Sequence, residues 1–91
     1  MPRRRRAMSD PSFNARFYAS VRDYLGRIEE MITQGDLATA QKTGHKMLGL
    51  CQLFGTPEQV ALCEELENAR DLHHLQQTLN RFYVQIDNAE V

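Results

Sequence analysis

The 91-residue chain has no tryptophan and only two cysteines, and no apolar run approaches the ~20 residues of a membrane-spanning helix. No apolar segment follows the N-terminal arginines, which argues against a secretory signal peptide. Runs of Val, Ile and Thr that are typical of strands are scarce. These absences favour one small cytoplasmic domain without membrane contact, in which Cys51 and Cys63 are reduced core thiols rather than a disulfide.

The charge is unevenly distributed along the chain. The net charge is -1, with 11 Lys and Arg against 12 Asp and Glu, and Arg3, Arg4, Arg5 and Arg6 supply four of the basic residues. Without this run the balance is seven to twelve, or -5. We interpret residues 1–9 as a basic, disordered tail. Nucleic-acid binding through Arg3–Arg6 is the less favoured alternative.

Apolar residues recur at intervals of three and four along four segments, which is the spacing of one helix face. The pattern predicts helices over about 11–34, 37–54, 57–69 and 72–88. The apolar positions are Phe17, Val21, Tyr24, Ile28 and Met31 in the first, Leu37, Ala40, Gly44, Met47, Cys51 and Phe54 in the second, Val60, Cys63 and Leu66 in the third, and Leu72, Leu75, Leu79, Phe82 and Ile86 in the fourth.

Capping residues support three of the boundaries. Pro11 suits a first helical position, Gly35-Asp36 separates the first two segments, and Gly55-Thr56-Pro57 separates the next two. The segment 68–71 contains neither Gly nor Pro, so one continuous helix to the C-terminus stays open as an alternative. Short connections predict an all-α, antiparallel up-down-up-down four-helix bundle over residues 10–91.

His45 is the residue that packing does not explain. It follows Gly44 and lies about 100° around the helix from the apolar stripe, so its imidazole is expected to be exposed. Gly49, one turn further on the same face, costs about 1 kcal/mol relative to alanine in a helix. The absence of a side chain there lets another molecule approach the imidazole closely. Neighbours of His45 on this face are Gln41, Lys42, Leu48, Gly49 and Gln52.

The stretch Gly44-His45-Lys46-Met47-Leu48-Gly49 resembles the phosphorylation-site motif of histidine phosphotransfer (HPt) domains of bacterial two-component phosphorelays. Gly55, ten residues after the histidine, and the turn Gly35-Asp36-Leu37 also resemble the family, as does the segment 63–70. The likeness extends from about 13 to 86.

The resemblance implies a phosphocarrier without ATP-dependent kinase activity, either free-standing or the C-terminal module of a hybrid sensor histidine kinase. His45 is then the phosphoacceptor, which takes a phosphoryl group from a receiver-domain aspartate and passes it to another response regulator. The implied partners are receiver domains of a hybrid kinase and of a downstream regulator. No cofactor is expected to bind stably, and Mg²⁺ is expected on the receiver.

The chain departs from the family three residues after the histidine, where many members have lysine and this one has Leu48. Lys42, Lys46, Gln41 and Gln52 are the predicted basic or polar support, and Leu48 is the predicted receiver-docking contact. A module that docks a receiver or kinase without transferring phosphate is the alternative that Leu48 favours.

Two further patterns are given structural interpretations. His73 and His74 point about 100° apart on one helix, so with Cys63 they do not predict a metal site. The glutamates at 58, 64, 65 and 67 are interpreted as a solvated helix face without a partner group, rather than as an acid–base site.

Overall fold

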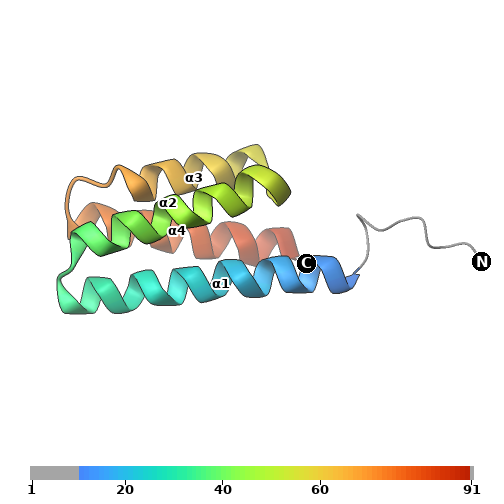
Figure 1. Ribbon diagram of the computed structural model, residues 1–91, viewed down its shortest axis with the longest axis horizontal. Helices are drawn as coiled ribbons and strands as arrows, with labels where there is room; N and C mark the ends of the chain where they lie inside the picture. Colours follow the sequence, from blue (N-terminus) through green and yellow to red (C-terminus); the bar gives the residue numbers. More distant parts are fainter. Residues whose placement is uncertain (1–10, 91) are drawn as a thin grey trace, which may run out of the picture.

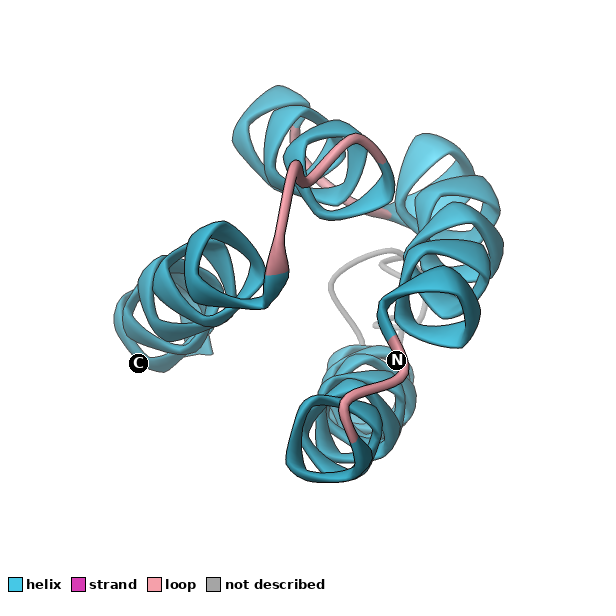
Figure 2. Cartoon of the chain, turned by 90° about the vertical axis from the view of Figure 1, so that its left-hand side faces the viewer, coloured by secondary structure: helices cyan, strands magenta, loops and turns pink. Residues whose placement is uncertain are grey.

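Four α-helices account for almost all of residues 11–90, the part of the chain that the computed structural model describes (Figure 1). They are α1 (Pro11–Gln34), α2 (Leu37–Phe54), α3 (Pro57–Glu67) and α4 (Leu72–Glu90). Successive helices run antiparallel, and a view along their axes shows all four around a common centre (Figure 2). The predicted all-α four-helix bundle is confirmed. The predicted tail and its arginines lie outside the described residues.

Side-chain caps fix where α2 and α3 begin. The Asp36 carboxylate accepts a hydrogen bond from the backbone N–H of Thr39 at 3.1 Å. The Thr39 side chain and this backbone N–H together hold the pKa of Asp36 below its usual value. Thr56 and Gln59 form a reciprocal capping box at α3, with each side chain accepting from the other residue's backbone N–H. Gly35 has a φ of 75°, a conformation that favours glycine.

The connection between α3 and α4 is a real break, so the alternative of one continuous helix is wrong. The side-chain amide of Asn68 donates to the carbonyl of Glu64 at 2.8 Å and closes α3 at Glu67, two residues before the predicted end. The Asp71 carboxylate accepts from the backbone N–H of His74 at 2.7 Å and starts α4. Because side chains rather than glycine or proline make this turn, the sequence signal is weak.

The core lies along the bundle axis and contains most of the predicted apolar positions. Leu25, which the predicted stripe omitted, is fully buried, whereas Phe54 is 47% exposed and contacts Phe13 edge to face. Cys51 and Cys63 are buried free thiols, as expected. A hydrogen bond with Cys51, together with burial, raises the pKa of the Cys63 thiol.

Gly44 allows α2 and α3 to approach closely. A Cβ atom at Gly44 would lie 3.1 Å from the Cβ of Leu66 and 3.4 Å from the backbone nitrogen of Glu67. The first distance is tighter than ordinary van der Waals contact and the second lies at its lower limit, so a side chain at this position would require α3 to shift by a few tenths of an ångström. The glycine therefore brings the second helix's next residue, His45, against the end of α3.

Candidate functional site

His45 projects from α2 with 67% of its side chain exposed. Its Nδ1 atom lies 2.8 Å from Oε2 of Glu67, the last residue of α3. The two residues meet because the turn between the helices is short. His45 lies ten residues before Gly55 and Glu67 eleven residues after Thr56, so they reach the same level of the antiparallel pair.

The hydrogen bond to Glu67 determines which nitrogen of a neutral His45 can react. An ionised carboxylate only accepts hydrogen bonds, so the shared proton is assigned to Nδ1. The lone pair of the neutral ring is then on Nε2, the nitrogen that Glu67 does not contact. The arrangement can present a nucleophilic Nε2 to solvent while the carboxylate orients the ring.

An open groove of about 560 Å³ surrounds the imidazole. It brings together four of the predicted site residues with two that were not predicted, and its lining is Ala38, Gln41, Lys42, His45, Lys46 and Glu67. The amide nitrogen of Gln41 donates to the Ala69 carbonyl at 2.8 Å, so it attaches α2 to the end of α3. Gln52 is exposed on α2 but does not line this groove.

Leu48 is not available as the predicted receiver-docking contact. Only 9% of the residue is exposed, and it belongs to the hydrophobic core cluster. Leu48 lies between the apolar stripe and His45 on the helix, and the close approach of α2 and α3 buries this side of α2. The prediction from helical spacing was therefore wrong, because spacing alone did not show how closely the third helix packs.

Gly49 faces open space. A Cβ atom added there would meet no heavy atom within 4 Å, in contrast to Gly44. The glycine therefore has no packing role in the isolated bundle, and the surface one turn beyond His45 is clear of side-chain atoms at this position.

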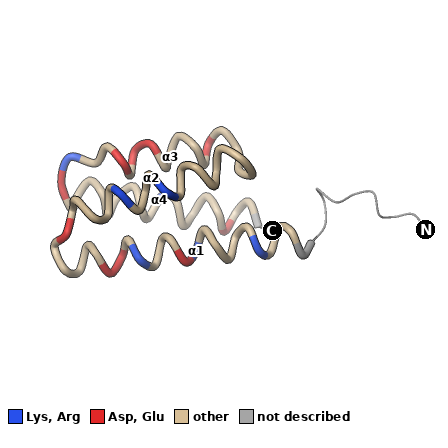
Figure 3. The backbone as a smooth tube through the Cα atoms, in the orientation of Figure 1, with Lys and Arg blue, Asp and Glu red and all other residues tan. Residues whose placement is uncertain are grey.

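Two of the four glutamates on α3 have partners, which corrects the expectation that none of the four has a partner group. Glu67 contacts His45, and Glu65 forms an ion pair with Arg81 on α4. The missed signal for Glu67 was its position opposite His45 across a short turn. Charges also separate between the helices, because α2 contains Lys42 and Lys46 and no acidic residue, whereas acidic residues lie along α3 (Figure 3).

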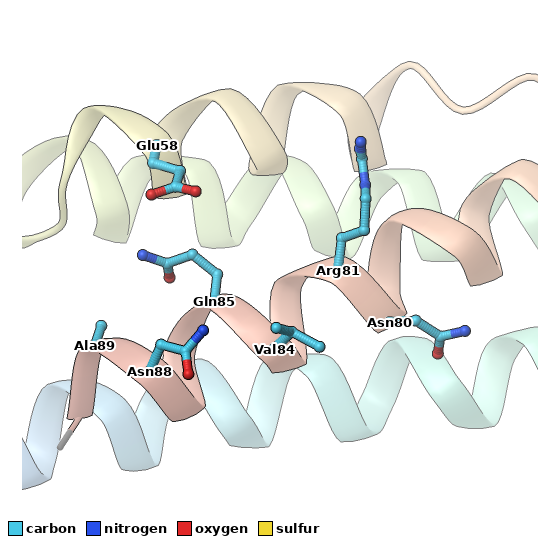
Figure 4. Close-up of a pocket in the computed structure, with 7 residues that line it drawn as sticks. All are labelled: Glu58, Asn80, Arg81, Val84, Gln85, Asn88 and Ala89. Carbon is cyan, nitrogen blue, oxygen red and sulfur yellow. The ribbon is translucent and has the colours of Figure 1, made fainter.

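A second groove, of about 530 Å³, lies between α3 and α4 (Figure 4). Glu58 on α3 faces Gln85 on α4, and amide side chains make up much of the wall. No histidine or cysteine lines it; its residues are Glu58, Asn80, Arg81, Val84, Gln85, Asn88 and Ala89. Among the described residues, no three His, Cys, Asp or Glu side chains come together as metal ligands would.

Fold and site together define a small four-helix domain with an exposed histidine on its second helix. A family model, Hpt domain, matches residues 14–89, and the chain therefore belongs to the Hpt family. Hpt domains carry phosphoryl groups on histidine in phosphorelays, act as phosphocarriers rather than kinases, and interact with receiver domains. Comparisons with curated proteins and with solved structures found no match. Within the described part of the chain, every helix is too short or too polar to cross a membrane.

Proposed function

We propose that His45 accepts a phosphoryl group at Nε2 from the aspartyl phosphate of one receiver domain and donates it to the aspartate of another. The observation that carries this proposal is the exposed imidazole whose Nδ1 is held 2.8 Å from Glu67, on the second helix of an Hpt-family bundle. We propose that the donor receiver belongs to a hybrid sensor kinase and the acceptor to a downstream cytoplasmic regulator.

The transfer step can be written with the atoms described. The Nε2 lone pair forms a bond to phosphorus as the bond from phosphorus to the aspartate oxygen breaks, and the electron pair leaves with the carboxylate. The imidazole ring then carries a positive charge, and the Glu67 carboxylate at Nδ1 neutralises it. Catalysis of this kind depends on positioning and charge neutralisation, with Mg²⁺ supplied on the receiver.

Lys42 and Lys46 provide the positive charge of the site in the absence of a lysine at position 48. Both line the groove with His45, and neither forms a salt bridge with another described residue. Their ammonium groups can therefore turn toward the phosphoryl oxygens when a phosphohistidine forms.

Phosphate transfer from a receiver charged with acetyl phosphate and Mg²⁺ tests the proposal. We expect the wild-type chain to acquire an acid-labile, alkali-stable phosphate, and the His45→Gln variant to acquire none. The matched control is His73→Gln, which removes another exposed histidine, on α4, and should leave the label unchanged. A label that persists in His45→Gln would place the phosphate elsewhere, and receiver binding without any label would identify a docking module.

A further inference from the structure

Leu53 is the most exposed large hydrophobic residue in the described part of the chain, with 76% of its surface accessible. A single exposed leucine is ordinary on a protein surface, so its exposure alone carries no meaning. The position of Leu53 is informative, because Leu53 follows Gly49 by four residues and His45 by eight. At 1.5 Å per residue, Leu53 lies about 12 Å along α2 from His45, with the open position of Gly49 between them.

The footprint of a docking protein reaches this far. A standard interface buries about 800 Å² on each partner, which corresponds to a disc of radius about 16 Å. A receiver that brings its aspartate to Nε2 of His45 therefore covers the outer face of α2 as far as Leu53. Eight residues correspond to about 80° of rotation from His45, so the leucine stays on the outer side of the helix.

The other exposed large hydrophobic residues do not lie on the outer face of α2 beside His45. Phe54 is nine residues from His45, half a rotation around α2, and its ring contacts Phe13 of α1. Val84, 60% exposed, lies on α4 and lines the groove between α3 and α4. Leu53 is thus the apolar side chain that shares the accessible face of His45.

Charge indicates which partner suits this face. Lys42 and Lys46 lie on α2 without any acidic residue of that helix, although the chain outside Arg3–Arg6 is acidic. An aspartyl phosphate with the carboxylates that hold its Mg²⁺ is an anionic surface, and opposite charges steer such a surface toward α2.

We propose that Leu53 is the apolar anchor through which a receiver domain docks over Gly49 onto His45, a proposal that rests on the proposed function. The partner is a receiver with an apolar patch about 12 Å from its phosphorylated aspartate and with acidic groups facing Lys42 and Lys46. Leu53 sets affinity and partner choice, and His45 carries the chemistry.

Calorimetric titration with the purified, unphosphorylated receiver domains of the source organism tests this anchor. For a receiver that binds the wild-type chain, Leu53→Ser should weaken binding about tenfold, the effect of losing 1.4 kcal/mol. Leu53→Met should restore it, and Val84→Ser, the matched exposed control, should change it by less than about twofold. Equal affinities of the wild type and Leu53→Ser would overturn the proposal, as would the absence of any receiver that binds the wild type.

Phosphotransfer kinetics separate this proposal from the proposed function. Leu53→Ser should raise the receiver concentration needed for half-maximal transfer about tenfold and leave the maximal rate unchanged. His45→Gln should abolish transfer and leave receiver affinity nearly unchanged. If His45 is never labelled while Leu53→Ser still weakens binding, the anchor stands and the relay function fails. If labelling is normal and insensitive to Leu53, the anchor fails alone.

Discussion

Replacement of Gly49 by alanine should make the domain more stable and a poorer phosphate carrier. A Cβ atom there meets nothing within 4 Å, so the substitution gains the full helix propensity difference of about 1 kcal/mol. For a domain of this size, that gain raises Tm by about 4–8 °C. Gly26→Ala on α1 is the matched control, because Gly26 is also helical and its added Cβ also meets no atom within 4 Å.

Gly49→Ala and Gly26→Ala should differ only in the rate at which they exchange phosphate with a receiver. The new methyl group at position 49 lies one turn from His45, on the face that the receiver must approach, whereas Gly26 lies on another helix. A displacement of the reacting groups by about 1 Å can lower a rate by about 10²-fold, and we expect a loss of up to this size for Gly49→Ala alone. Thermal unfolding and transfer rates at saturating receiver measure both effects. Wild-type transfer by Gly49→Ala would refute the reasoning about access, and a lowered Tm would refute the open environment of the glycine.

Glu67→Ala should slow phosphate transfer about 10–100-fold without weakening receiver binding, because the imidazole loses the carboxylate that orients it. Glu67→Gln should recover part of the transfer rate, and the control Glu64→Ala should leave the rate unchanged. An equal loss of rate in Glu67→Ala and Glu64→Ala would contradict the role of Glu67. The caps at Asp36 and Asp71 make stability depend on pH. The pKa of Asp36 is lowered by the side chain and then the backbone N–H of Thr39, and that of Asp71 by the backbone N–H of His74. The stabilising contribution of each carboxylate is therefore complete above the unfolded pKa of about 3.9 and disappears as pH falls through the lower folded pKa. Tm should therefore fall in acid, and less steeply in Asp36→Asn, which retains a capping oxygen; identical acid profiles would argue against the cap.

Much of the fold follows from local signals in the sequence. The spacing of apolar residues, the N-cap at Asp36 and the C-cap at Gly55 define α2 as the structure has it. The exposure of His45 follows from its 100° offset from the core stripe, since that offset is a property of one helix.

The features that were missed depend on how two helices pack. The burial of Leu48 requires α3 to lie close to α2, and the contact between His45 and Glu67 requires the register that the short turn sets. The spacing of residues along one helix gives neither the distance between two helices nor their register. Phe54 continues the apolar spacing, but it is the last residue of its helix, it is partly exposed, and its ring contacts Phe13 of α1.

The short turn between α2 and α3 also has a consequence for the order in which the molecule assembles. The contact of His45 with Glu67 spans 22 residues, and all of its supports, from Gly44 against Leu66 to the capping box at Thr56, lie within the same helical hairpin. Contacts between residues close in sequence form with little loss of chain entropy, so they are favoured early in folding. The histidine acquires its orienting carboxylate from its own hairpin, and α1 and α4 supply the buried core that keeps this hairpin folded.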